Sequence, residues 1–492
     1  MLESEHSFHP GIDYHRKWYV MIAIAIGIFM STIDSSIVNV ALPTLVIDLD
    51  TDLPTIQWIV LAYLLTLSTF LLSVGRLADM KGKKSIYTSG FLIFTLGSLF
   101  CGISSNVNWL IASRVLQAIG ATMILGLGTA IVTEAFPPRE LGLALGVTGT
   151  MVSIGIVIGP TLGGLLLSIA NWHWIFFVNL PLGILGIYLA VRFIPATKPH
   201  GGQRFDYPGA FALLLSLLLF LFSLTFGQQE GFNSPRILIM LILSALSLCA
   251  FVLIEQRSSQ PMIDLKLFRD RLLSINLITG FITFFAIAGT TFLMPFYLEN
   301  AMGFDERQVG LLLATVPIAM GIVAPISGTL SDRLGSRRIA VIGLLILLVG
   351  YYLTSNLNMQ TNALEYVLRF LPIGLGMGIF QSPNNSAIMG AAPKERLGVV
   401  SGILAINRTI GQITGIAILG AIWSSQVTKY TAEGLRIDAT NAPSPLQVAG
   451  LQSTLMVTVL LISLALGLSI WALIQEHHDR STITVKSKVT RD

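Results

Sequence analysis

Long apolar segments dominate this chain and limit the folds open to it. Fourteen of them occur along the 492 residues, at approximately 18–43, 54–75, 86–104, 109–133, 141–168, 173–194, 207–227, 235–255, 272–298, 307–329, 338–355, 364–389, 397–423 and 449–474. A helix needs roughly 20 apolar residues to cross a bilayer, and lipid offers open backbone groups no hydrogen-bond partner. Only 11% of the residues are charged, against about a quarter in soluble domains. The sequence therefore predicts an all-α polytopic membrane protein with fourteen transmembrane helices.

The placement of lysine and arginine predicts the orientation of these helices. With a cytoplasmic N-terminus, the cytoplasmic segments hold 23 of the 30 basic residues and the external segments hold four. Cytoplasmic loops of membrane proteins carry such an excess. We therefore expect both termini on the cytoplasmic side of the cell membrane (inner or plasma membrane). The net charge of +4 matters less than this placement, and we expect the lipid bilayer, not nucleic acid, as a partner.

One short loop pattern occurs twice, 253 residues apart. A glycine, an aspartate, a second glycine and a basic tail keep the same spacing in both copies, at Gly75, Asp79, Gly82, Lys83 and Lys84 and at Gly328, Asp332, Arg333, Gly335 and Arg337. Four glycines of segment 141–168 also recur 256 residues later. Nearly equal offsets indicate a duplicated chain, and many transporters are built from duplicated halves around a central site.

The duplication predicts how the chain is divided. We expect two six-helix bundles, at 18–195 and 272–475, with the two helices at 205–257 inserted between them. The other parts are a cytoplasmic N-terminus (1–17), a cytoplasmic linker (258–271) and a cytoplasmic tail (476–492). The linker alternates polar and apolar residues, as suits a segment lying at the membrane interface.

The duplicated loop resembles the signature loop of the major facilitator superfamily. With the inserted helix pair, the layout is similar to the fourteen-span drug:proton antiporter branch of that family, the multidrug-exporter type. The resemblance implies two bundles that rock against each other, with Asp79 and Asp332 latching the cytoplasmic side by bonding to helix N-termini. The first copy departs from the family pattern, because Met80 stands where arginine is usual. A plainer alternative is that both loops are merely positive and set the topology.

Segment 155–164 resembles the antiporter motif of drug exporters, which marks export in that family. Its small residues and proline are Gly155, Gly159, Pro160, Gly163 and Gly164. Small residues allow two helices to approach closely, and proline permits a bend. Generic small-residue packing is the alternative interpretation.

Asp34 is the only carboxylate deep within a predicted span. A charge at the membrane centre costs about 2.5–3.5 kcal/mol on insertion scales, so such a group is normally paired or functional. Burial favours the protonated carboxyl and a nearby cation favours the ionised one. Arg114 lies in a segment similar to the family's fourth-helix motif, at about the same membrane depth as Asp34. We expect Asp34 to be a proton-coupling site tuned by Arg114; the alternative is a static buried pair that stabilises the fold.

Polar residues within the other apolar segments are candidates for a substrate cavity, because amides and charges avoid lipid. They are Gln117, Gln381, Asn384, Asn385, Asn407 and Arg408. Arg408 has no basic counterpart in the first half. It binds either an anionic substrate group or a partner carboxylate, or else it anchors the fold through helix-end carbonyls or Asn407.

These features favour secondary active transport. The chain lacks a phosphate-binding Gly-Lys-Ser/Thr loop, and we expect no cofactor, no metal site and no enzymatic activity. The leading hypothesis is a proton-coupled exporter of amphipathic small molecules that works by alternating access. The alternatives are a lipid or glycolipid flippase, a non-transporting membrane receptor or regulator, and proton-coupled uptake. Exporters of this type in two-membrane bacteria often work with a periplasmic adaptor, which makes an adaptor a candidate partner.

Overall fold

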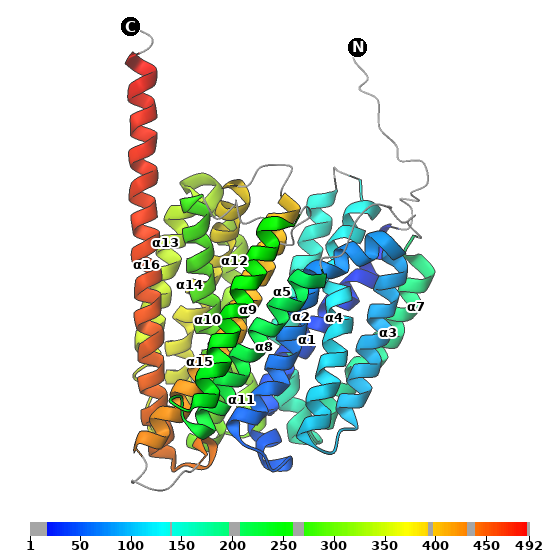
Figure 1. The fold of residues 1–492 in the computed structure, drawn as a ribbon, viewed down its shortest axis with the longest axis vertical. Helices are drawn as coiled ribbons and strands as arrows, with labels where there is room; N and C mark the ends of the chain where they lie inside the picture. Colours follow the sequence, from blue (N-terminus) through cyan, green and yellow to red (C-terminus); the bar gives the residue numbers. More distant parts are fainter. Residues whose placement is uncertain are drawn as a thin grey trace.

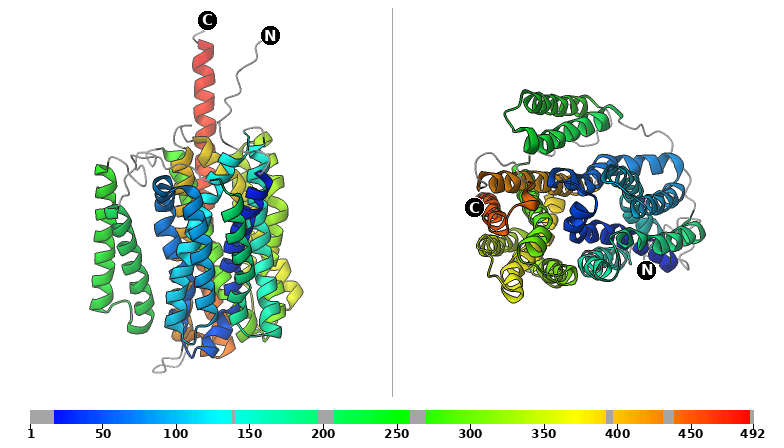
Figure 2. Two further views of the ribbon diagram at one scale, coloured as in Figure 1. Left: turned by 90° about the vertical axis from the view of Figure 1, so that its right-hand side faces the viewer. Right: turned by 90° about the horizontal axis from the view of Figure 1, so that it is seen from below.

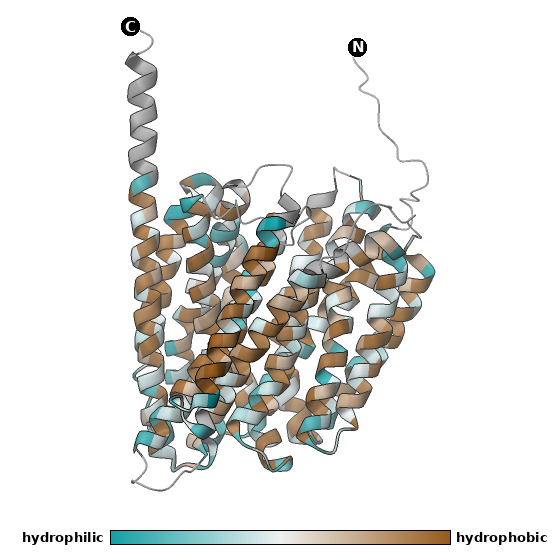
Figure 3. Ribbon diagram, in the orientation of Figure 1, coloured by the Kyte–Doolittle hydropathy of each residue, from teal (hydrophilic) through white to brown (hydrophobic). Residues whose placement is uncertain are grey.

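The computed structural model describes residues 17–137, 140–195, 207–258, 270–391, 397–430 and 438–489. Within these ranges fourteen helical segments are long and apolar enough to cross a membrane, which confirms the predicted number. They run side by side, with hydrophobic residues over their middle portions and hydrophilic residues gathered at both ends (Figures 1 and 3). The structure is therefore an all-helical bundle of membrane-spanning length.

The helices form three sets along the chain. The first comprises α1 (Lys17–Asp48), α2 (Leu53–Lys81), α3 (Lys83–Gly102), α4 (Val107–Ala135), α5 (Leu141–Ile169), α6 (His173–Phe177) and α7 (Asn179–Phe193). The second comprises α8 (Tyr207–Glu230) and α9 (Pro235–Arg257). The third comprises α10 (Arg271–Phe296), a π-helical turn η3 (Tyr297–Ala301), α11 (Glu306–Leu313), α12 (Thr315–Leu334), α13 (Ser336–Thr354), α14 (Ala363–Ala391), α15 (Leu397–Tyr430), a short 3-10 turn η5 (Ala439–Asn441) and α16 (Ser444–Val489).

Three predicted helices differ from what the apolar pattern indicated. The predicted span 173–194 is two helices, α6 and α7, separated at Val178, and the span 307–329 is α11 and α12, separated at Ala314. The last helix continues well past the predicted span 449–474, because α16 runs to Val489 through most of the expected tail. The expected linker lies mainly in residues 259–269, outside the described residues.

The two copies of the loop pattern form the same sharp turn. Gly82 separates α2 from α3 with φ 90° and ψ 133°, and Gly335 separates α12 from α13 with φ 91° and ψ 131°. Side chains on a Cβ atom clash at such positive φ values, which glycine adopts readily. The shared glycine spacing thus encodes a shared backbone conformation.

Helices α1–α7 pack mainly on one another, as do α10–α16, and we call these sets the N-group and the C-group. In the N-group α3 packs on α4 and α1 on α5; in the C-group α13 packs on α14 and α10 on α15. The pair α8 and α9 stands together at the side of the bundle (Figure 2). Its contacts reach both groups, because α8 touches α2 and α15.

Polar contacts hold the α8–α9 pair together and attach it to the N-group. Ser216 Oγ donates to the Ser244 carbonyl oxygen at 3.0 Å, and Ser244 Oγ donates back to the Ser216 carbonyl oxygen at 2.9 Å. The Trp58 indole N–H of α2 donates to Thr225 Oγ1 of α8 at 3.0 Å. Such bonds satisfy polar groups that lipid would leave unpaired.

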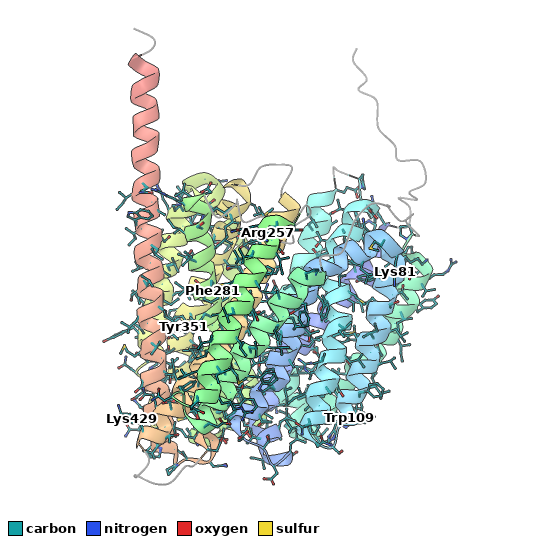
Figure 4. The ribbon with its side chains drawn as sticks, in the orientation of Figure 1. Lys81, Trp109, Arg257, Phe281, Tyr351 and Lys429 are labelled. Atoms are coloured by element: carbon teal, nitrogen blue, oxygen red, sulfur yellow. The ribbon has the colours of Figure 1, made fainter. Side chains whose placement is uncertain are left out.

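The start of α1 and the end of α16 lie at the same end of the bundle, which we call the termini end (Figure 1). Lys81 and Arg257 lie toward this end, whereas Trp109 and Lys429 lie near the opposite end (Figure 4). The N-group and C-group touch at the opposite end: α5 packs on α11, and the Leu53 backbone N–H donates to Asp438 Oδ2 at 3.1 Å.

Candidate functional site

Asp34 of α1 and Arg114 of α4 form a buried ion pair. Asp34 is 0% exposed and Arg114 is 1% exposed. The guanidinium Nη1 donates to Asp34 Oδ2 at 2.6 Å, and Nε donates to the Ile59 carbonyl oxygen of α2 at 3.1 Å. The guanidinium also lies over the Tyr63 ring, 4.2 Å from its centroid. Side chains and backbone of α1 and α2 therefore hold the arginine of α4 in place, which fixes the charged group opposite Asp34.

The second carboxylate oxygen of Asp34 accepts two amide donors. Gln117 Nε2 of α4 donates to Oδ1 at 2.7 Å, and Asn179 Nδ2 of α7 donates to the same atom at 2.9 Å. Gln117 also donates to Ser98 Oγ of α3 at 2.8 Å and accepts a bond from Arg114 Nη1 at 2.5 Å. Both carboxylate oxygens therefore accept hydrogen bonds, one from the Arg114 guanidinium and the other from two side-chain amides.

We call Asp34, Arg114, Gln117, Asn179 and Ser98 the Asp34 cluster. Hydrogen bonds within such a buried network strengthen one another, and the Asn179 Oδ1 atom is the member that has no partner among the described residues. Protonating Asp34 would remove the charge that the guanidinium faces and would turn one acceptor oxygen into a donor. The cluster is therefore an arrangement of bonds that gain or loss of one proton would rearrange.

A central cavity of about 320 Å³ lies between the N-group and the C-group. Its lining residues come from α1, α2 and α5 on one side and from α10, α11, α12, α14 and α15 on the other. Hydroxyl and amide side chains are mixed with methionine and aromatic ones, including Asn39, Gln412, Met320 and Phe370. Mostly apolar cavities with a few polar groups are typical of small-molecule sites.

Helix α1 separates the Asp34 cluster from the cavity. Thr32, Ser35 and Ser36 line the cavity, whereas Asp34 is buried against α4 and α7. Helix α2 is divided in the same way, with Leu64 on the cavity and Tyr63 against Arg114. The ionisable site and the cavity therefore occupy opposite faces of the same two helices.

Only two of the six predicted cavity residues line this cavity, Gln381 and Arg408. Gln117 belongs instead to the Asp34 cluster. Asn384 Nδ2 donates to the Asn276 carbonyl oxygen at 3.2 Å, and Asn407 Nδ2 donates to the Leu277 carbonyl oxygen at 2.9 Å, so both tie their helices to α10. Asn385 is half-buried and is not among the lining residues.

Arg408 of α15 is the one charged side chain among the described residues that line the cavity. Its guanidinium carbon lies 5.4 Å from the centroid of the Phe284 ring. Within the described ranges no carboxylate pairs with it. Arg369 lies 255 residues after Arg114 and occupies the corresponding place in the second half. Unlike Arg114, it donates from Nη1 to a backbone carbonyl oxygen, that of Asn356, at 2.7 Å near the opposite end.

The small residues of segment 155–164 pack α5 closely on two neighbours. Ser36 Oγ of α1 donates to the Gly155 carbonyl oxygen at 3.1 Å, and a Cβ added at Gly159 would collide with Ser36. A Cβ added at Gly163 would lie 2.9 Å from Ile37 Cγ1. Gly164 faces the other way, against the Glu306 and Gly310 backbone of α11. Pro160 borders the cavity.

The described contacts of the duplicated loops stay within their own groups. Lys83 pairs with Glu134 of α4, and Arg337 Nη1 donates to the Ala472 carbonyl oxygen of α16 at 3.2 Å. Arg333 is exposed, and Lys84 is partly exposed. Gly75 lies in α2 and Gly328 in α12. The expected latch rests on Asp79 and Asp332, whose side chains lie outside the described residues.

Asn179 and Ser98 are members of the Asp34 cluster that were not predicted from the sequence. Asn179 could have been noticed, because an amide within the apolar run 173–194 is costly in lipid unless it is paired. Ser98 carries no such signal, since serine is common wherever membrane helices pack closely.

Comparison with known proteins places the chain in a family. The profile of the Major Facilitator Superfamily matches residues 24–416. The chain is 35% identical over 418 residues to the riboflavin transporter RibZ of Clostridioides difficile (strain 630), covering 84% of this chain and 90% of that protein. It is 34% identical over 403 residues to the multidrug resistance protein Stp of Mycobacterium tuberculosis (strain ATCC 25618 / H37Rv), covering 82% of this chain and 75% of that protein.

The solved structures agree at the level of fold. A bacterial homologue of the human lysosomal transporter Spinster, in an inward-facing and unoccupied conformation, matches with a TM-score of 0.66 at 17% identity, covering 95% of this chain and 98% of that one. The family profile spans most of the chain, and relatives above 30% identity align along most of its length. The chain therefore belongs to the major facilitator superfamily and is a membrane-spanning transporter whose relatives include multidrug resistance proteins.

Proposed function

We propose that this chain is a proton-coupled exporter of amphipathic small molecules that works by alternating access in the cell membrane, with both termini in the cytoplasm. The observation that carries the proposal is the Asp34 cluster. The Asp34 carboxyl accepts bonds from Arg114 and Gln117 of α4 and from Asn179 of α7. Helix α1 carries Asp34 on one face and, on another, residues of the cavity that the N-group and the C-group both line. Intramembrane ionisable residues mark proton and ion pathways in transporters.

The coupling step follows from the two faces of α1. When Asp34 takes up a proton, its attraction to the Arg114 guanidinium falls and the amide bonds to Oδ1 rearrange. This rearrangement of bonds reaches the cavity through α1, because Ser35 and Ser36 follow Asp34 directly in the chain and line the cavity. It reaches α5 as well, because Ser36 bonds to the Gly155 carbonyl oxygen. Protonation of Asp34 thereby shifts the equilibrium between the arrangement that is open to the cytoplasm and the one that is open to the outside.

The described contacts between the groups support an arrangement that is closed at the opposite end. Gly164 of α5 packs against the α11 backbone there, and Leu53 of α2 bonds to Asp438. In the proposed orientation this end faces away from the cytoplasm. The cavity then loads from the cytoplasm in this arrangement, and the groups must separate at the opposite end to release substrate.

Proteoliposomes with an imposed pH gradient test the coupling. A panel of dyes, antibiotics and labelled lipids identifies a transported compound, and Asp34→Asn keeps the shape of the side chain but removes the ionisable proton. We expect gradient-driven transport to be lost in this variant. Glu365→Gln is the matched control, because Glu365 is a half-exposed carboxylate of α14 that lies near the opposite end of the bundle. Undiminished gradient-driven transport by a folded Asp34→Asn protein would refute the proton role.

Riboflavin transport is a second candidate. The relative RibZ, at 35% identity and 90% coverage, is named a riboflavin transporter. The mixed polar and apolar lining of the cavity suits a fused aromatic ring with a hydroxylated chain. Adding riboflavin to the same panel tests this candidate, and saturable flux in the absence of other substrates is the expected result.

A further inference from the structure

We infer that the central cavity selects amphipathic substrates that carry an anionic group, such as a carboxylate or a phosphate, and that Arg408 binds that group. The inference rests on the proposed transport function and specifies its substrate class. It is carried by the charge of the cavity wall, by the free edge of the guanidinium and by the distribution of polar and apolar lining residues.

The charge of the cavity wall has one sign. Arg408 is the one charged residue among the described lining residues, which include no aspartate or glutamate. The membrane carboxylate of the N-group, Asp34, is 0% exposed and already bonded to Arg114. A permanent cation without a counter-charge attracts anions and repels cations, and low-dielectric walls strengthen both effects.

A purely structural role for Arg408 finds little support in its surroundings. The residue expected to anchor it, Asn407, donates its amide to the Leu277 carbonyl oxygen instead. No hydrogen bond from Arg408 to another described residue accompanies its contact with Phe284, whose ring centroid lies 5.4 Å away. An aromatic ring holds a guanidinium by its face. The N–H donors at the edge of the guanidinium therefore remain for a ligand, and their fork matches a carboxylate or phosphate.

The remaining lining suggests what the anionic group is attached to. Gln412 lies one helical turn beyond Arg408 on α15, and Gln381 of α14 and Asn39 of α1 add further hydrogen-bonding groups. Methionine side chains, including Met320 and Met377, supply a soft apolar surface that adapts to varied ring systems. The expected ligand has an apolar or aromatic body and one anionic group directed toward α15.

Direct binding tests the inference without a proton gradient. The full-length protein in lipid nanodiscs is titrated with 1-pyrenesulfonate and with 1-pyrenemethylammonium, two fluorescent probes that share a ring and differ in the sign of their charge; empty nanodiscs give the background. We expect tighter binding of the sulfonate to the native protein. Arg408→Gln should weaken sulfonate binding about tenfold or more, as for loss of a charge-assisted hydrogen bond.

Two further variants separate charge from folding. Arg408→Lys keeps the charge and should retain a preference for the sulfonate, with lower affinity. Glu365→Gln removes a charge outside the cavity lining and should leave the affinities of both probes unchanged. Equal affinity for the two probes, absence of binding by both, or unchanged sulfonate affinity in Arg408→Gln would each overturn the inference. Failure of proton coupling appears separately, as gradient-driven transport that persists in Asp34→Asn.

Discussion

Adding one methyl group at Gly164 should open the end of the carrier that is closed in this structure. A Cβ at this position would lie well inside 3.0 Å of the Glu306 carbonyl oxygen and 3.1 Å from Gly310 Cα. Both obstacles are backbone atoms of α11, so no side chain can rotate away. Overpacking of this kind costs about 1–3 kcal/mol. This cost destabilises only the arrangement in which α5 touches α11, because the clash disappears when the two helices separate. The ratio of open to closed molecules at this end should therefore rise about 5–150-fold.

Distances between spin labels on α5 and α11 measure this ratio. Ile169 and Leu311 are exposed residues of these two helices, and I169C/L311C in a C249S background provides the label pair. Gly164→Ala should shift the distance distribution toward longer values. Gly149→Ala on the same helix is the matched control, because a Cβ there meets nothing within 4 Å. A Gly164→Ala distribution identical to those of the native protein and the control would refute the reasoning.

Three further predictions concern other contacts. Trp58→Phe removes the bond from α2 to α8 and should lower the free energy of unfolding by about 0.5–1.5 kcal/mol, measured by denaturant unfolding in detergent. Arg114→Gln leaves Asp34 buried without its cation and should cost about 3–5 kcal/mol; the double variant with Asp34→Asn should cost less than Arg114→Gln alone, and an equal or larger cost would contradict the pairing. In detergent, maleimide should label the exposed Cys249 and spare the buried Cys101, as read by mass spectrometry.

Features that depend on local sequence were predictable. Each apolar run is long enough to require a helix whatever its neighbours are, so the fourteen spans follow from the chain itself. The shared spacing of Gly82 and Gly335 indicated a duplication, and the two glycines form matching turns because a positive φ value restricts the residue type at that position.

Features that depend on which way a helix faces were not predictable. Gln117 and Asn407 were assigned to the cavity because polar groups avoid lipid, but the same requirement is met by bonds inside a bundle. In a membrane protein the lipid-facing and buried faces of a helix are both apolar, so periodicity does not distinguish them. The pairing of Asn179 with Asp34 requires knowing how α7 packs on α1, which only the tertiary structure supplies.

The positive charge that Arg408 brings to the cavity wall has an electrical consequence. If one anion leaves the cell for each proton that enters, both movements carry charge in the same direction, and each cycle transfers two charges. Each charge is worth about 2.3 kcal/mol per 100 mV, so a potential of 100 mV, negative inside, contributes about 4.6 kcal/mol per cycle. Exchange of one cation for one proton would transfer no net charge. A carrier with Arg408 in its cavity would therefore be driven by membrane voltage as well as by the pH gradient, and would continue to export when only the voltage remains.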